Sequence, residues 1–120
     1  MSTEGELGKL GEKLAFEHLL EKGYQVHERN YRFNRAEVDI VAQKHNRMIF
    51  VEVKTRRREY MSEPEFTIPI KKQRQLIKAA DGYLKEKAID LESRFDVITV
   101  IVGDTSNRLD HLEGAFYPTL

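Results

Sequence analysis

A hairpin signature between Ala36 and Thr55 limits what this chain can fold into more than any other stretch. Two segments, 36–41 and 48–55, alternate apolar and charged residues and are rich in β-branched side chains. The polar residues from Lys44 to Arg47 separate them. This pattern predicts two antiparallel strands joined by a short turn. The dipeptide His45-Asn46 is not among the strongest turn formers, so the turn type stays open.

Alternation along each strand divides its side chains between two faces. On the first strand, one face is expected to carry Ala36, Val38 and Ile40, and the other Glu37, Asp39 and Val41. On the second strand, one face is expected to carry Ile49, Val51 and Val53, and the other Phe50, Glu52 and Lys54.

A turn centred on His45-Asn46 also fixes the pairing of the strands, because position 44 then pairs with 47. This register places Asp39 opposite Glu52 and Glu37 opposite Lys54. Opposed like charges destabilise a sheet, and such side chains lie only roughly 5 Å apart. A divalent cation between Asp39 and Glu52 would resolve the conflict, since magnesium binds one or two carboxylates together with water and phosphate oxygens.

Lys54 follows Glu52 by two residues and is therefore expected on the same face. Its ammonium group could orient or help to deprotonate a water molecule, or stabilise charge on a phosphate. The alternative is a solvated amphipathic hairpin in which Glu37 and Lys54 are ordinary cross-strand partners. A register slip or a bulge would also break the pairing, and the residues alone leave these interpretations open.

Length and composition exclude several classes of protein. The chain has 120 residues, which suits one domain, here expected over 9–118 after a flexible N-terminal end at 1–8. It has no cysteine, which rules out disulfides and zinc–thiolate sites. Its net charge of zero argues against a uniformly basic nucleic-acid binder but permits a local basic patch. No segment reads as a membrane span or a signal peptide, so we expect a cytoplasmic protein with no membrane partner.

A helix is predicted over 7–22, with Gly23 as the residue that ends it. Its apolar side is formed by Ala15, Phe16, Leu19 and Leu20. Glu12 falls within this apolar arc, where a carboxylate is costly unless it is paired or bound to a cation. Glu12 is therefore a candidate site residue, or else an acid near a helix start that reaches solvent.

The remaining elements complete the expected architecture. We expect strands over 24–31, 94–102 and 109–117, the last at an edge, and a second helix over 70–87. The helix before the strand at 94–102 permits a parallel crossover. The order αβββαβ plus a terminal strand predicts an α/β fold with one mixed sheet flanked by helices.

Basic and amide residues near the ends of these elements are candidates for contact with phosphates. They are Arg35, Arg56, Arg57, Lys71, Lys72 and Gln73. Beside a metal site, such residues would suit a phosphodiester backbone. A solvated surface is the alternative for each of them.

The series Glu12, Asp39 and Glu52-x-Lys54 in an αβββαβ order resembles the PD-(D/E)XK restriction-endonuclease-like nucleases. Within that superfamily the chain is most similar to the YraN-like endonuclease family, itself similar to archaeal Holliday-junction resolvases. The resemblance covers about residues 10–116. It is carried by GEKLAFEHLLEKGY, ERNYRFNRAEVDIV, IFVEVKTR, KKQRQLIKAADGYL, RFDVITV and HLEGAF. That family usually has glycine at the position of Ala36 and near Ser62, and neither difference removes a candidate catalytic group.

The resemblance implies that Asp39, Glu52 and the carbonyl of Val53 bind Mg²⁺ or Mn²⁺. It further implies that Lys54 is the catalytic lysine and that Glu12 completes the site. We therefore expect an endonuclease that cleaves DNA, with branched or nicked DNA as the expected partner and a homodimer if the substrate is a junction. The alternatives from other classes are a DNA-binding accessory protein that keeps the fold without turnover, and a plain interaction domain.

Overall fold

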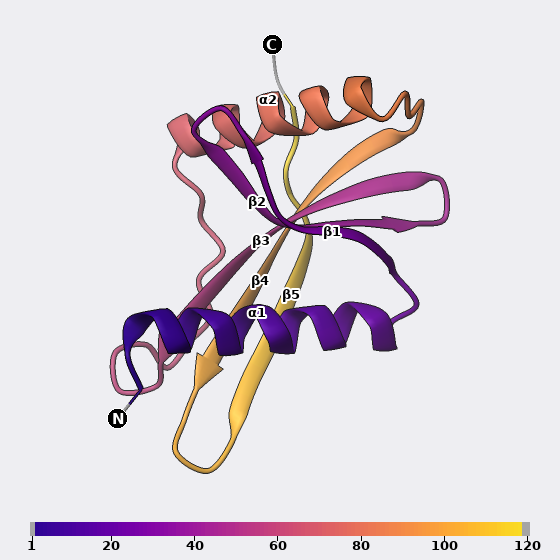
Figure 1. Ribbon diagram of the computed structural model, residues 1–120. Helices are drawn as coiled ribbons and strands as arrows, with labels where there is room; N and C mark the ends of the chain where they lie inside the picture. Colours follow the sequence, from indigo (N-terminus) through magenta and orange to yellow (C-terminus); the bar gives the residue numbers. More distant parts are fainter. Residues whose placement is uncertain (1, 119–120) are drawn as a thin grey trace.

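A five-stranded mixed sheet forms the centre of the protein, and one helix covers each of its faces (Figure 1). The computed structural model describes residues 2–118. The helices are α1 (Glu4–Glu21) and α2 (Ile70–Glu86), and the strands are β1 (Gln25–Phe33), β2 (Ala36–Lys44), β3 (Arg47–Arg57), β4 (Glu92–Val102) and β5 (Asn107–Phe116). The strands lie in chain order, with β3 and β4 parallel and the other neighbours antiparallel. The predicted fold class is confirmed.

Two separate cores hold the helices to the sheet. The core under α1 is built from Ala15 and Leu19 of the helix against Ile40, Val51 and other apolar residues of the sheet. The core under α2 is larger and includes the rings of Phe50, Phe95, Phe116 and Tyr83. In the part of the chain that the structure describes, neither helix is long and apolar enough to cross a membrane.

Helix α1 begins earlier than its apolar pattern predicts. Thr3 and Glu6 form a capping box, in which the Thr3 hydroxyl accepts from the Glu6 N–H and the Glu6 carboxylate accepts from the Thr3 N–H, each at 3.1 Å. Residues 4–8, expected at the flexible end, are therefore helical. Gly23 follows the helix with a φ of 87°, the left-handed conformation expected of the residue that ends it.

The hairpin has the predicted turn and register over its first half. Lys44 pairs with Arg47, and the ladder continues inward to the pair Ile40 and Val51. It stops there, so Asp39 and Glu52 are not a backbone pair, and neither are Glu37 and Lys54. The strands separate at the residues that the sequence marked as a candidate site.

The alternation of faces holds along β3 and fails along β2. Ile49 and Val51 lie in the α1 core and Phe50 lies in the α2 core, as predicted. On β2, however, Val38 packs in the α2 core while Ile40 packs in the α1 core, so the prediction that they share a face is wrong. Asn30 of β1, opposite Asp39, has a φ of 55°, a left-handed conformation that distorts the sheet at this point.

Two glycines of α1 give a matched test of how closely the helix packs. A Cβ at Gly11 would lie 1.8 Å from the Thr55 hydroxyl oxygen, whereas a Cβ at Gly8 would meet nothing within 4 Å. We expect Gly11→Ala to lower the free energy of unfolding by about 1–3 kcal/mol, because the helix must move off β3. Gly8→Ala should raise it by about 0.5–1 kcal/mol through helix propensity. Urea denaturation checks both, and equal effects would contradict the packing.

Candidate functional site

A cleft of about 330 Å³ opens where β2 and β3 separate. Its lining includes the acids Glu37, Asp39 and Glu52 and the bases Arg35 and Lys72. The acids come from β2 and β3, and Lys72 comes from the first turn of α2. Three of the residues predicted for metal or catalysis, Asp39, Glu52 and Val53, thus line one cleft.

The side chain of Asp39 hydrogen-bonds to β3 at a point where the main chain of β2 is no longer paired with it. Its Oδ2 accepts a hydrogen bond from the Val53 N–H at 2.7 Å, and this contact substitutes for a ladder bond past Val51. Burial raises the pKa of Asp39 to about 8, and the nearby negative charge of Glu52 adds to the rise. Among residues 2–118, Asp39 forms no ion pair with a lysine, arginine or histidine. A partly buried carboxyl group without a counter-charge therefore keeps its proton up to about neutral pH when no cation is bound.

Glu52 is buried and forms an ion pair with Lys72. Its side chain is 8% exposed, and its Oε2 accepts a hydrogen bond from the Lys72 ammonium group. Lys72 was predicted to face a phosphate, and in this structure it contacts Glu52. The two descriptions are compatible, because 46% of the Lys72 side chain is open to solvent.

Glu12 reaches the same region from α1 through a contact that the sequence did not reveal. With its amide oriented to satisfy both partners, Asn30 donates to one carboxylate oxygen of Glu12 and one of Glu37, each at 2.9 Å. Burial raises the pKa of Glu12, and the charges of Glu37 and Glu52 raise it further. Four carboxyl groups therefore gather around the cleft with few cations, and the local field favours a bound cation.

Lys54 is on the predicted face of β3, but its ammonium group is directed to the loop before α2. It donates to both carboxylate oxygens of Glu65, at 3.2 and 3.3 Å, and to the carbonyl of Thr67. The Glu65 carbonyl accepts from the buried Thr99 hydroxyl at 2.9 Å, which anchors the loop to β4. Hydrogen bonding to Lys54 lowers the pKa of Glu65. Glu65 lies in an aperiodic loop, where no spacing pattern could have predicted it.

The other predicted phosphate-binding residues are spread over different surroundings. Arg35 lines the cleft and Lys71 is exposed beside it on α2. Arg56 is exposed and donates to the Thr55 carbonyl, while Arg57 binds the start of α1 through the Ser2 carbonyl and Glu4. The Gln73 amide donates to the Ile68 carbonyl at 2.8 Å, so it holds the loop instead of facing the cleft.

The acids of the cleft are suitable ligands for a hard divalent cation. Within residues 2–118 no three His, Asp or Glu side chains converge as a complete metal site. Magnesium nevertheless needs only one or two carboxylates, because water and substrate phosphate supply the other oxygens. Asp39 and Glu52 offer those two carboxylates. In an extended strand the N–H and C=O of one residue point to the same neighbour, so the Val53 carbonyl faces Asp39 as its N–H does.

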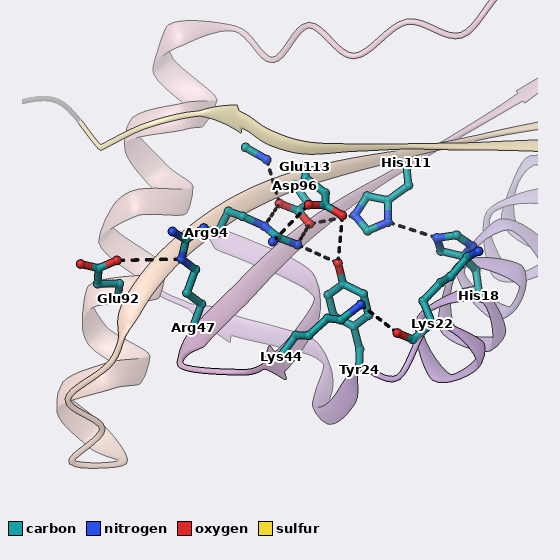
Figure 2. Close-up of polar contacts among 11 residues, drawn as sticks. His18, Lys22, Tyr24, Lys44, Arg47, Glu92, Arg94, Asp96, His111 and Glu113 are labelled. Carbon is teal, nitrogen blue, oxygen red and sulfur yellow. Dashed lines mark hydrogen bonds and ion pairs between the residues drawn. The ribbon is translucent and has the colours of Figure 1, made fainter.

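A second polar cluster lies away from this cleft and joins α1, β4 and β5 (Figure 2). Asp96, buried to 1% exposure, accepts from Arg94 at 2.8 and 2.9 Å, from His111 at 2.8 Å and from the Gly114 N–H at 3.0 Å. His111 in turn contacts His18 of α1 at 3.1 Å. Burial acts to raise the pKa of Asp96, but these hydrogen bonds outweigh it and hold that pKa below its ordinary value. Both carboxylate oxygens of Asp96 accept hydrogen bonds, so the cluster has a structural role and holds α1, β4 and β5 together.

Comparison with known proteins shows which family the chain resembles in sequence. Residues 11–100 match the model of the uncharacterised protein family UPF0102. A UPF0102 protein of Bacteroides thetaiotaomicron is 44% identical over all of this chain and 99% of its own length. A UPF0102 protein of Christiangramia forsetii is 41% identical over 98% of each chain. This chain therefore belongs to the UPF0102 family.

Proposed function

We propose that this protein is a divalent-metal-dependent nuclease of the PD-(D/E)XK type that hydrolyses phosphodiester bonds of DNA in the cytoplasm. The observation that carries the proposal is the carboxyl pair Asp39 and Glu52 in the lining of one cleft, where Glu52 pairs with Lys72 and Asp39 pairs with no cation among residues 2–118. Acids in such a place repel a phosphate unless a cation lies between them. A module that only binds nucleic acid gains nothing from them.

Each group of the cleft has a distinct part in this proposal. Asp39, Glu52 and the Val53 carbonyl would hold Mg²⁺ or Mn²⁺. When bound, such an ion supplies Lewis acidity, which lowers the pKa of water and offsets charge on a phosphate. Arg35 would bind the DNA backbone. Glu12, whose pKa is raised, is suited to accept or hold a proton beside the reacting groups.

Lys54 would contribute positive charge from outside the cleft's lining, where its ammonium group contacts the loop before α2. Its position is fixed by Glu65 and Thr67, and its side chain is 12% exposed. A lysine held in one place stabilises charge without the cost of ordering a free side chain. Glu65 thus acts as a positioning residue for Lys54.

Cleavage assays with purified protein test the proposal. The substrates are a four-way junction, a flap, a nicked duplex, a linear duplex and a single strand, each with Mg²⁺ or Mn²⁺. Activity on at least one of them supports the proposal. Cutting of junctions would also require two clefts, and therefore a homodimer in solution. Tight DNA binding with no metal uptake and no cleavage of any substrate would favour the accessory-protein alternative.

We expect Lys54→Met to reduce the cleavage rate by about a hundredfold, since it removes a positioned charge from the reacting region. The fold should be kept at a modest cost in stability, because Met keeps the aliphatic part of the side chain while Glu65 and Thr67 lose their hydrogen bonds to the ammonium group. Lys85→Met is the control, because Lys85 lies at the far end of α2 and pairs with Asp81 at 2.9 Å. Equal rates for the wild type and Lys54→Met would remove Lys54 from the mechanism.

A further inference from the structure

Lys72 differs from the other basic residues near the cleft in its contact with the buried acid. Its ammonium group binds Glu52, while Lys54 binds Glu65 on the loop. Arg35 lines the cleft, and Lys71 is exposed beside it. Within residues 2–118, Lys72 is therefore the single lysine paired with either member of the Asp39–Glu52 pair.

The local sequence of α2 gives no reason for a lysine at this place. The helix begins after Pro69 without a side-chain cap, and its first turn has no acid. A cation in the first turn is unfavourable for the helix dipole. The favourable contact of Lys72 comes from Glu52, 20 residues earlier in the chain.

The two ends of this ion pair differ in their freedom to move. The Glu52 carboxylate is fixed in the cleft, with 8% of its side chain exposed, whereas 46% of Lys72 is exposed. When a divalent ion takes Glu52, the lysine can turn outward without leaving the helix. Lys71 and Arg74, both exposed, add further positive charge within the first five residues of α2.

We propose that Lys72 is a tethered counter-ion that competes with the divalent cation for Glu52 and, once displaced, binds a backbone phosphate of the DNA. This inference rests on the proposed function. It assigns Lys72 two partners, one after the other: first the Glu52 carboxylate and then a phosphate of the DNA. The two roles predict effects of opposite sign when the charge is removed.

The Lys72→Met variant should bind Mn²⁺ more tightly and DNA less tightly. Calorimetric titration with Mn²⁺ should show a dissociation constant about three- to tenfold lower than that of the wild type, because the metal no longer displaces an ammonium group. In duplex-DNA binding with Ca²⁺ present, the slope of log affinity against log salt should fall by about 0.9, the effect of one lost phosphate contact. Neither readout requires turnover.

Two further variants separate this role from a general effect of charge. Lys71→Met removes the same charge one residue away and should leave Mn²⁺ affinity within about twofold of the wild type, since exposed charges at such distances are screened. Lys72→Arg keeps the charge and should keep both wild-type values. If the wild type binds Mn²⁺ and Lys72→Met binds it no more tightly than the wild type does, this inference alone is overturned. A wild type that takes up no Mn²⁺ would overturn it together with the proposed function.

Discussion

Replacing Asp39 by asparagine should abolish metal-dependent cleavage and at the same time make the metal-free protein more stable. Loss of a metal ligand should lower activity by roughly a hundredfold or more, since even outer-shell partners of such ligands are worth about 10–100-fold. The gain in stability follows from the place of Asp39. Its carboxylate is partly buried, lies beside Glu52, and has no cationic partner among the described residues.

The raised pKa of Asp39 determines how the free energy of unfolding of the wild type changes with pH. The pKa of Asp39 is about 8 in the folded protein, against an ordinary value of 3.8. Between these values the folded state holds a proton that the unfolded state has lost, so this group's contribution to stability falls as the pH rises from about 4 to 8. One pKa unit corresponds to roughly 1.4 kcal/mol. After allowance for relaxation and partial solvent access, we expect Asp39→Asn to gain about 2 kcal/mol at pH 8.

Thermal melts of the wild type and Asp39→Asn at pH 5 and pH 8, without divalent ions, check the stability effect. The two proteins should differ little at pH 5 and by several degrees at pH 8. Saturating Mn²⁺ should stabilise the wild type and leave Asp39→Asn unchanged. A variant that is less stable than the wild type at pH 8 would show that Asp39 has a counter-charge after all.

Among the substitutions proposed for this protein, removal of the buried carboxylate of Asp96 should lower the free energy of unfolding the most. We expect Asp96→Ala to lower the free energy of unfolding by about 3–5 kcal/mol, because Arg94 and His111 would lose the anion that they share in a buried place. The lowered pKa of Asp96 means that its contribution is present above about pH 4 and is lost as the pH falls through its folded value. The variant should therefore also lose part of its sensitivity to acid.

Asp110→Asn is the matched control for this measurement. Asp110 also lies on the β4–β5 side of the sheet and pairs with Arg108 at 2.7 Å, but both side chains are substantially exposed. An exposed pair of this kind contributes about 0–1 kcal/mol. Urea denaturation of the two variants at pH 7 gives the comparison. Similar losses in both would mean that the Asp96 cluster is not the tie between α1, β4 and β5 that its contacts indicate.

The sequence predicts the sheet well because its strongest signals are local. The turn at His45-Asn46, the two-residue period of β3 and the long apolar run of β4 each depend on neighbours along the chain. The start of α1 could also have been predicted. Thr3 and Glu6 have the spacing of a capping box, and they stand just before the first residue of the apolar pattern.

The details of the cleft depend on contacts between distant residues, and these were predicted less well. Simple alternation could not show that β2 changes faces at Asp39, since the distortion involves the left-handed Asn30 on another strand. Spacing along α2 did not distinguish Lys72 from Gln73, and only the first reaches the cleft. Arg94 and Asp96 are two residues apart on one face of β4 and form an ion pair. The apolar residues around them indicate a buried strand but give no sign of this pair.

The early end of the β2–β3 ladder means that part of the site is made of main chain. The Val53 amide is held by Asp39, and its carbonyl faces the same gap, whereas its side chain packs toward α1. Replacement of valine by another β-branched residue would leave these main-chain atoms unchanged. Natural variation at position 53 would therefore be limited by how the side chain fits between the helix and the sheet, while the proposed ligand, a main-chain carbonyl, is common to every residue type.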